Sequence, residues 1–274
     1  MTHDNKELFN VTDGKIVSFK NPEIKKTIEE VVIYDDGVTV IGKELFKGCR
    51  NLKTVSFLTD DITEIEEDAF SECISLSDIY FPENLKKIGA RAFYYCRSLK
   101  AVRIPSGVTV IEQATFDNCV SLEYFRYEKL TSIEYGAFAH CVKLNSFSDV
   151  GKKGLFITDG TTKIGESAFE DCESIKSITI SGTVKEIEKS AFLDCKSVEA
   201  INLESGIESI GSLAFRENDM VCSLTIPKSV KNIGENAFLN CKNLLKVFVS
   251  YGLFKPFGWK KGWNGNAVII KRNA

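Results

Sequence analysis

Cysteine is the residue type most able to do chemistry in this 274-residue sequence, which contains nine of them. Thiols can bind zinc, but zinc sites usually use close pairs such as Cys-x₂-Cys, and the sequence has none. Eight of the cysteines recur at long regular intervals, with Asn218 in the place of another, so we interpret them as a structural column of small buried side chains. An Asn there can hydrogen-bond the backbone of a neighbouring turn. We therefore expect neither a metal nor a cofactor. The eight regular cysteines are Cys49, Cys73, Cys96, Cys119, Cys141, Cys172, Cys195 and Cys241.

Other candidates for catalysis are few. The only histidines are His3 and His140, and no Ser-His-Asp, phosphate-binding glycine loop or His-x-x-x-His spacing occurs. The acidic run Glu66–Asp68 falls where we expect a short helix to begin, a place that favours negative charge. Cys222 lies outside the regular spacing at the edge of an expected strand, where it is either a reactive thiol or a small surface residue. We predict that the protein is not an enzyme.

Composition narrows the class of partner. The chain has 35 basic and 38 acidic residues and a net charge of −3, so no long-range attraction to nucleic acid or anionic membranes is expected. No apolar run approaches the roughly 18 residues that indicate a transmembrane helix, so we expect no membrane insertion. The segment 1–10 lacks the pattern of a signal peptide. An exported protein would therefore have its signal outside this sequence.

The elements that must position these residues come from an internal repeat. Each copy has an Ile five residues before a Phe, usually an Ala directly before it, a Cys three after, and apolar residues six, nine and eleven after; the clearest copy surrounds Phe192. The Phe residues are separated by 24, 23, 23, 22, 31, 23, 23 and 23 positions. They are Phe46, Phe70, Phe93, Phe116, Phe138, Phe169, Phe192, Phe215 and Phe238.

Each copy divides into two halves. The apolar alternation of a segment such as 99–104 predicts a short strand, and the segment around each Phe predicts one or two helical or 3₁₀ turns. Because no single copy can bury its own apolar residues, the copies should stack into an α/β solenoid with a parallel sheet on one side. We expect an N-terminal cap over 1–37 containing a hairpin at 11–16, nine repeats over 38–249, and a C-terminal cap over 250–274. The longer interval predicts an insertion that bulges as a loop near 148–156.

The frame Ile-Gly-x-x-Ala-Phe-x-x-Cys-x-x-Leu-x-x-Ile-x-Ile-Pro resembles the BspA-type leucine-rich repeat over residues 38–249. The resemblance implies a right-handed leucine-rich-repeat solenoid with parallel strands on its concave face. It also implies a surface or secreted protein that adheres to host components or other partners. The aromatic segment 258–264 resembles the tail that often closes such arrays.

The strand face is the predicted binding surface. We define it by the residues eight and ten positions after each Phe, which should point outward from the sheet. Tyr and Arg dominate interface energetics, and they gather in the second to fourth repeats, whereas the later repeats carry small polar residues. The alternative is an ordinary solvated sheet face. The candidate partner-binding residues are Tyr80, Arg103, Tyr124, Arg126, Lys246 and Phe248.

Two tryptophans beyond the last repeat admit two interpretations. Trp259 and Trp263 could stack on sugars, but their position favours capping of the last repeat, together with Phe254 and Phe257. We predict a monomeric, non-catalytic cell-surface or secreted module that binds a protein or glycan. An intracellular (cytoplasmic) protein scaffold and a structural spacer for another domain remain open alternatives.

Overall fold

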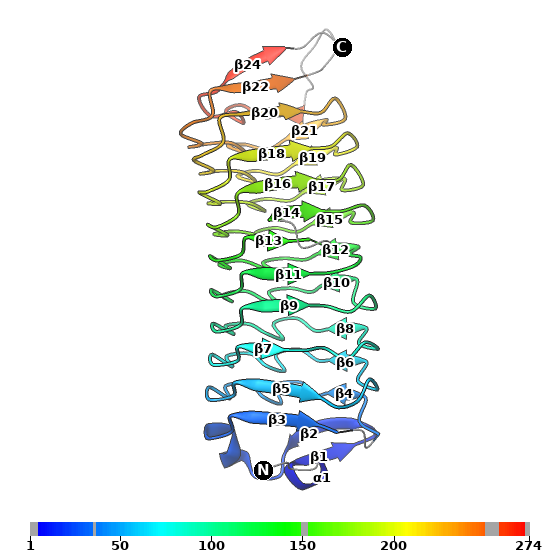
Figure 1. The fold of residues 1–274 in the computed structure, drawn as a ribbon. Helices are drawn as coiled ribbons and strands as arrows, with labels where there is room; N and C mark the ends of the chain where they lie inside the picture. Colours follow the sequence, from blue (N-terminus) through cyan, green and yellow to red (C-terminus); the bar gives the residue numbers. More distant parts are fainter. Residues whose placement is uncertain (1–4, 35–36, 149–152, 250–257, 272–274) are drawn as a thin grey trace.

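The chain forms a single tall stack of coils, drawn as a nearly straight column in Figure 1. The structure, a computed structural model, describes residues 5–34, 37–148, 153–249 and 258–271. The N-terminal elements lie at one end of the column and the C-terminal strands at the other. None of the described residues belongs to a helix long and apolar enough to cross a membrane.

The strands expected after each Cys are present, and neighbouring ones pair in parallel as predicted. Their apolar alternation places every second side chain in the core, as in the pattern exposed–buried–exposed of Ala101–Arg103. We call these the long strands, by their place in the repeat, although β7 and β13 have only two residues each. They are β3 (Glu30–Ile33), β5 (Thr54–Phe57), β7 (Asp78–Ile79), β9 (Ala101–Arg103), β11 (Tyr124–Arg126), β13 (Ser146–Phe147), β14 (Gly154–Ile157), β16 (Ser177–Ile180), β18 (Ala200–Leu203), β20 (Ser223–Ile226), β22 (Lys246–Val249) and β24 (Val268–Lys271).

A second parallel sheet, which we did not predict, is built from strands of two residues each. With one exception, these short strands end on the Ile that precedes each Phe by five positions, and that Ile is buried. Two residues are too few to show any periodicity in a sequence, so no pattern could reveal them. The short strands are β4 (Val40–Ile41), β6 (Glu64–Ile65), β8 (Lys87–Ile88), β10 (Val110–Ile111), β12 (Ser132–Ile133), β15 (Lys163–Ile164), β17 (Glu186–Ile187), β19 (Ser209–Ile210), β21 (Asn232–Ile233) and β23 (Gly258–Trp259).

The prediction of helical or 3₁₀ turns around each Phe is wrong. The described residues between 38 and 249 contain no helix. Around Phe169, Ser167 and Asp171 instead adopt the left-handed conformation, with φ of 55° and 57°. Successive backbone amides of the turn donate alternately within the turn and to the next coil. The amide of Cys172 donates to the Phe169 carbonyl at 3.3 Å, and the amide of Phe169 donates to the Ala191 carbonyl of the next coil at 2.8 Å. Half of these bonds span three residues, as in a 3₁₀ helix, whereas the others join the coils.

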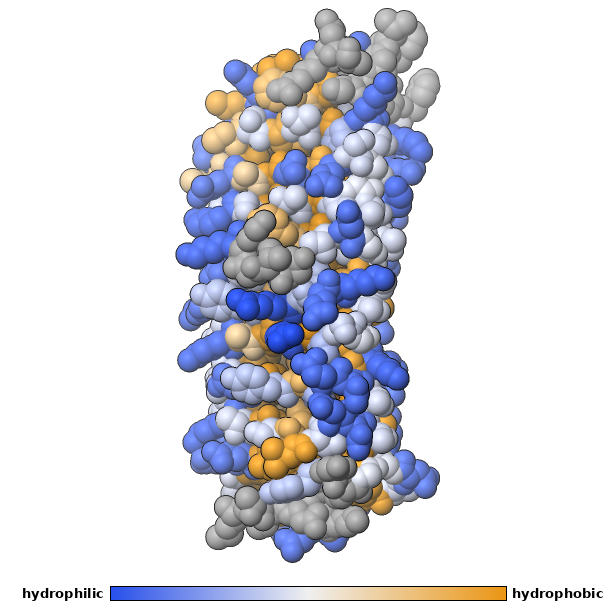
Figure 2. Space-filling view, turned by 45° about the vertical axis from the view of Figure 1, so that its right-hand side comes forward, coloured by the Kyte–Doolittle hydropathy of each residue, from blue (hydrophilic) through white to orange (hydrophobic). Residues whose placement is uncertain are grey.

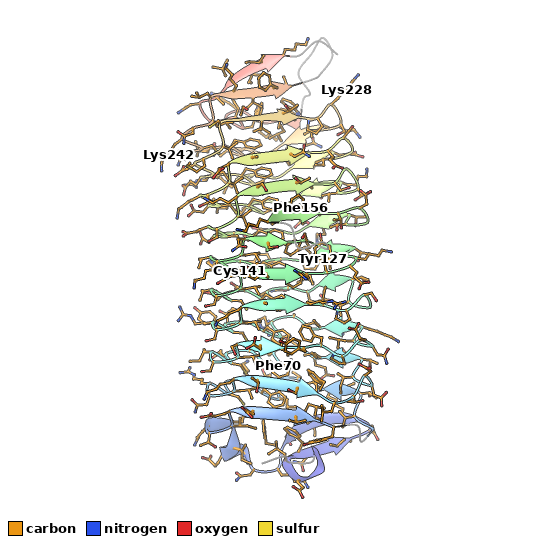
Figure 3. All side chains as sticks on the ribbon, viewed as in Figure 1. Phe70, Tyr127, Cys141, Phe156, Lys228 and Lys242 are labelled. Atoms are coloured by element: carbon orange, nitrogen blue, oxygen red, sulfur yellow. The ribbon has the colours of Figure 1, made fainter. Side chains whose placement is uncertain are left out.

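The Phe residues form a continuous buried stack through the column. From Phe46 to Phe238, successive rings lie nearly parallel with centroids 4.8–5.5 Å apart. This distance matches the spacing of about 4.8 Å between strands, because each coil contributes one ring to the stack. Figure 3 shows Phe70, one member of the stack, inside the column.

The cysteine column has the structural role that we predicted. Each thiol from Cys73 onward donates to the carbonyl of the Phe in the preceding coil, as Cys96 does to Phe70 at 3.2 Å. Asn218 makes the equivalent bond through Nδ2, at 2.8 Å from the Phe192 oxygen. A buried donor at this position therefore satisfies a backbone carbonyl in the turn.

The insertion in the fifth interval differs from our expectation of a loop. Residues 149–152 lie outside the described residues, but Gly154–Ile157 form β14, an additional long strand between β13 and β16. On the other side of the column, β12 pairs directly with β15. Tyr127 donates a hydrogen bond to the Phe156 carbonyl, and Figure 3 shows the two residues close together. The long-strand side thus gains a strand that the short-strand side lacks.

Aromatic side chains cover both ends of the Phe stack. The elements α1 (Asn5–Leu8) and η1 (Pro22–Lys26) flank the predicted hairpin, which is confirmed as β1 (Phe9–Thr12) and β2 (Lys15–Phe19) around a two-residue turn. The ring centroids of Phe19 and Phe46 lie 5.5 Å apart, and at the far end those of Trp263 and Phe238 lie 6.0 Å apart. Trp259 and Trp263 are both buried, which leaves no indole face for a sugar. Phe254 and Phe257 lie outside the described residues.

Candidate functional site

Four of the six predicted binding residues line one groove on the long-strand side. The groove has a volume of about 540 Å³ and includes Tyr80, Arg103, Tyr124 and Arg126. The other two, Lys246 and Phe248, lie on β22, six strands away from β11, or about 30 Å at the usual strand spacing. Lys246 is exposed and Phe248 is half-buried. We call the first set the Arg–Tyr groove; its lining residues are Asp78, Ile79, Tyr80, Phe81, Glu83, Ala101, Val102, Arg103, Pro105, Tyr124 and Arg126.

Strand register explains why these side chains meet. In the pairing of β9 with β11, Arg103 lies opposite Arg126, and Ala101 lies opposite Tyr124. All four residues are exposed, because residues two apart on a strand share a face. Tyr80 follows β7 and is 79% exposed. Spacing in the sequence therefore predicted the outward direction of these side chains.

The outward direction was predicted wrongly where the insertion begins. Ser146 and Ser148 occupy the positions eight and ten after Phe138, yet both are buried. In the regular repeats the same positions hold exposed or half-buried residues, such as Asn202 and Thr225. β13 is followed directly by the additional strand β14, which no regular repeat has. The spacing of the regular repeats therefore does not predict which residues of β13 are buried.

The groove lies where the ladders between strands are interrupted. Among the described residues, β7 is not hydrogen-bonded to β9 on the long-strand side, nor β8 to β10 on the short-strand side. The turns still join these coils through backbone hydrogen bonds. The amide of Phe93 donates to the Thr115 carbonyl at 2.9 Å, and the amide of Tyr95 donates to the Asp117 carbonyl at 2.9 Å. Directly before the two strands, the amide of Lys100 also donates to the Ser77 carbonyl at 3.3 Å. The coils are therefore held together at the turns and at the start of these strands, while β7 and β9 themselves form no ladder.

Charge in the groove is mixed. Arg103 has one long ion pair, with Nη2 at 3.7 Å from Oε1 of Glu128, and both side chains are more than 60% exposed, so the pair is weak. Arg126 has no ion pair with any residue that the structure describes. Asp78 and Glu83 place two carboxylates along the same groove. Two arginines, two tyrosines and two carboxylates thus line the same groove.

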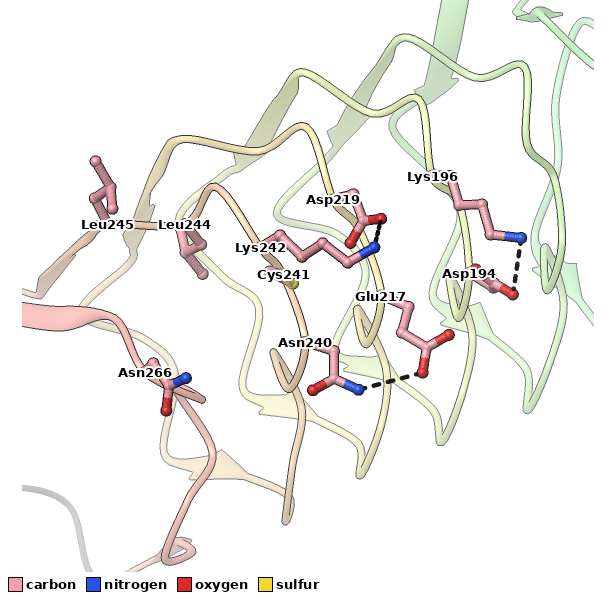
Figure 4. Close-up of a pocket in the computed structure, with 10 residues that line it drawn as sticks. All are labelled: Asp194, Lys196, Glu217, Asp219, Asn240, Cys241, Lys242, Leu244, Leu245 and Asn266. Carbon is pink, nitrogen blue, oxygen red and sulfur yellow. Dashed lines mark hydrogen bonds and ion pairs between the residues drawn. The ribbon is translucent and has the colours of Figure 1, made fainter.

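A second hollow lies near the C-terminal end, beside the turns that follow each Phe (Figure 4). We call this side of the column the turn side. Lysines pair with two of its three acids: Lys196 Nζ lies 3.3 Å from Asp194 Oδ2, and Lys242 Nζ lies 2.7 Å from Asp219 Oδ2. The third acid, Glu217, pairs with Arg216 at 2.7 Å. Within the described ranges, no group of three or more His, Cys, Asp or Glu side chains could hold a metal ion. We interpret this hollow as part of an ion-pair network between coils.

His140 belongs to the same turn side. It adopts the left-handed conformation, with φ of 58°, two positions after Phe138. Its Nδ1 lies 2.9 Å from Asp117 Oδ1, and its Nε2 lies 3.5 Å from Asp171 Oδ2. The hydrogen bond with Asp117 raises the pKa of His140, although burial opposes the shift. The histidine thus joins three neighbouring coils electrostatically.

The thiols divide into two kinds. Burial raises the pKa of Cys49 and of Cys241 to about 11, which makes their thiolates scarce at neutral pH. Cys222 is the exposed cysteine among the described residues. Its reactivity remains a prediction.

Hydrophilic side chains stand along both borders of the face drawn in Figure 2, with hydrophobic atoms visible between them. Lys242 projects from the turn side in Figure 3. Such a surface places charge at the turns and leaves the strand faces to differ from coil to coil.

Solved structures similar to this chain are bacterial leucine-rich-repeat proteins. A leucine rich repeat protein of T. pallidum is 21% identical, with 89% of this chain and 91% of that one covered and a TM-score of 0.52. A leucine rich cell surface protein from Faecalibacterium prausnitzii is 23% identical, with 94% and 84% covered and a TM-score of 0.47. The pneumococcal vaccine antigen PcpA is 16% identical, with 97% and 85% covered and a TM-score of 0.49.

These likenesses concern fold alone, and no curated protein matches the chain. The family described as the BspA type Leucine rich repeat region matches residues 18–145 and 142–255 in 6 copies. This match spans most of the sequence and agrees with the repeated Ile, Phe and Cys positions that build the column. The chain therefore belongs to the BspA-type leucine-rich repeat family.

Proposed function

We propose that the protein is a non-catalytic recognition module that binds a protein or glycan partner through the Arg–Tyr groove. The observation that carries the proposal is the convergence of Tyr80, Arg103, Tyr124 and Arg126 in one groove. Tyr and Arg combine large contact areas with directed hydrogen bonds, and they are enriched among residues that dominate binding energies. Membership of a repeat family that typically binds proteins supports the same function.

The scaffold favours such a role because it holds these side chains on strands. Arg103 and Arg126 project from paired strands whose opposite faces are locked by the buried Val102 and Phe125. Side chains presented by a packed sheet lose less conformational freedom on binding than side chains on a loop. In this proposal, Lys246 and Phe248 contact the partner at a second place on the strand face, which only an extended partner would reach.

The proposed setting is the cell surface or the extracellular space, as is typical of the family. A monomer would leave the groove free for a partner. Size-exclusion chromatography with light scattering would measure the oligomeric state, and surface labelling of the native cells would test the location.

A binding screen tests the function directly. The folded protein would be applied to extracellular-matrix proteins and to a glycan array, alongside the double variant Arg103→Glu/Arg126→Glu. We expect a reproducible partner whose affinity falls at least about a hundredfold in the variant, because two favourable charges become repulsive. The control is Thr179→Glu/Asn202→Glu, which places two glutamates at the equivalent positions of β16 and β18 and changes the net charge by −2, against −4 for the arginine variant.

The outcomes separate the alternatives. A partner that binds both double variants as well as the parent protein would rule out the groove as the site. If neither panel yields a partner, the scaffold and spacer functions gain support, and partners should be sought by pull-down from the native cell.

A further inference from the structure

The paired arginines point to a ligand with a single anionic group. Arg103 and Arg126 lie opposite each other on adjacent strands and on the same face, about 4.8 Å apart at the backbone. Two guanidinium groups at that spacing can converge on the two oxygens of one carboxylate. Arg126 has no ion pair among the described residues, and Arg103 has only the exposed 3.7 Å contact with Glu128. Little must therefore be broken before a ligand carboxylate can bind.

The tyrosines supply an apolar surface beside that charge. Tyr124 lies opposite Ala101, whose small side chain leaves the neighbouring side of the ring uncovered, and Tyr124 is 43% exposed. The Tyr124–Ala101 pair lies two residues before the arginine pair on the same strands, or roughly 6.6 Å along them. An aromatic ring at this distance can cover the apolar face of a sugar while the arginines hold a carboxylate on it.

The acids of the groove narrow the ligand further. Asp78 and Glu83 offer oxygens that accept hydrogen bonds from hydroxyl groups. The same two charges cancel those of the arginines, so a polyanion such as a sulfated polysaccharide would meet no surplus of positive charge. A ligand with one carboxylate and several hydroxyls satisfies the arginines, the tyrosines and the acids together.

We infer that the Arg–Tyr groove binds an acidic saccharide, in which Arg103 and Arg126 hold the carboxylate of one sugar and Tyr124 covers its ring. This inference rests on the proposed function and specifies the ligand of that same site. Asp78 and Glu83 receive hydroxyl groups of the sugar, and Tyr80, which is 79% exposed, covers its outer side.

Titration with matched saccharides tests the inference. The probes are 3′-sialyllactose and galacturonic acid, each with one carboxylate, compared with lactose and with the methyl ester of galacturonic acid. Binding is followed by calorimetry and ligand-observed NMR. We expect at least one acidic probe to bind and its neutral counterpart to bind about tenfold to a hundredfold more weakly. Arg103→Gln/Arg126→Gln should weaken the acidic probe by a similar factor, and Tyr124→Ala should weaken it too.

Controls keep this result interpretable. Asn202→Gln/Thr225→Gln alters the strand face away from the groove and should leave binding unchanged; melting temperatures confirm that every variant is folded. Equal binding of acidic and neutral probes, tighter binding of heparin that is lost in Arg103→Gln/Arg126→Gln, or no binding of either acidic probe would overturn the inference.

A failure here is distinguishable from failure of the proposed function. A protein partner from the screen that is lost in Arg103→Glu/Arg126→Glu would keep the groove as the binding site and reject the saccharide. A partner that is indifferent to that variant would reject the groove itself.

Discussion

The coils of β7–β11 and those of β16–β18 share one interior and differ on the outside. Phe93 and Phe192 each stack on the rings before and after them at 5.2–5.5 Å. On the strand face, the first region presents Tyr80 and Arg103 where the second presents Thr179 and Asn202. The interior positions are bound to the stack, whereas outward positions can change without altering it. Recognition can therefore vary from coil to coil on a constant core.

The two regions also differ in their backbone ladders. β16 pairs with β18 over four residues, and β15, β17, β19 and β21 form an unbroken series. Beside the groove, both sheets are interrupted at the same level, between β7 and β9 and between β8 and β10. A further interruption between β18 and β20 affects the long-strand side alone. The groove thus coincides with the level at which strand pairing ceases on both sides.

The largest expected effect tests whether the interiors are equivalent. Phe192→Ala and Phe93→Ala should each lower the free energy of unfolding by about 3–5 kcal/mol, since both empty a site in the stack. Chemical denaturation measures the loss, and Asn202→Ala, on the exposed face, should change it by less than about 0.5 kcal/mol. A loss below about 1 kcal/mol at either Phe would show that the interiors are not alike.

Hydrogen exchange sharpens the contrast between the ladders. The amide of Glu188 donates to the Ile164 carbonyl at 3.0 Å, whereas that of Glu112 makes no corresponding bond to Ile88 in the described structure. Because exchange requires an amide that is free of its bond, Glu112 should exchange at least about tenfold faster than Glu188. Exchange followed by NMR compares the same residue type at equivalent positions. Equal protection would mean that the coils beside the groove are as firmly joined as the others.

A smaller effect concerns pH and the turn side. The residue two positions after each Phe adopts the left-handed conformation. It is Tyr95 or Asn118 in the coils beside the groove, and Asp171 or Asp194 in the later coils. Burial, together with a hydrogen bond and repulsion from Asp194, raises the pKa of Asp171 to about 6. The folded state therefore binds this proton more tightly than the unfolded state, and the resulting stability is present below about pH 4 and lost as pH rises through 6.

His140 acts in the same direction. Its raised pKa means that its stabilising contribution is present below the unfolded value of about 6.5 and is lost as pH rises through the folded value. We expect the contribution of Asp171 to the free energy of unfolding to fall by on the order of 1 kcal/mol between pH 4 and pH 7. Asp171→Asn should remove most of that change from the pH dependence of the free energy of unfolding, whereas Asn202→Ala, on the exposed strand face, should leave it unchanged. An unchanged slope in Asp171→Asn would contradict the assignment.

The smallest effect is chemical. Native protein should react with a thiol reagent at Cys222, while the cysteines of the regular column become reactive only after unfolding, because burial both hides them and suppresses thiolate formation. Mass spectrometry of the labelled peptides measures this, with Cys222→Ser as the control. Rapid labelling of Cys73 or Cys96 would show that the coils beside the groove open.

Much of the fold could be predicted because it follows from spacing. The interval between Phe residues specifies one ring per coil, and the alternation around Ile201 specifies a strand with one buried face. The same alternation predicted that Tyr124 and Arg126 face outward on one strand. The second sheet could not be predicted, because a strand such as Ser209–Ile210 is too short to carry a pattern. The turns were predicted wrongly as helical. Their backbone makes the three-residue hydrogen bonds of a 3₁₀ helix, but left-handed residues such as Ser167 and Asp171 prevent a helix from forming.

The sequence by itself determined the repeat, the buried column of Phe and Cys, the parallel strands and the outward direction of the candidate residues, because each depends on local spacing. Only the tertiary structure decided that strand pairing beside the groove is interrupted on both sides, between β7 and β9 and between β8 and β10. It also decided that the insertion contributes β14 to the sheet. Those outcomes depend on hydrogen bonds and packing between coils more than 20 residues apart, and a periodic pattern contains no information about which of those contacts is broken.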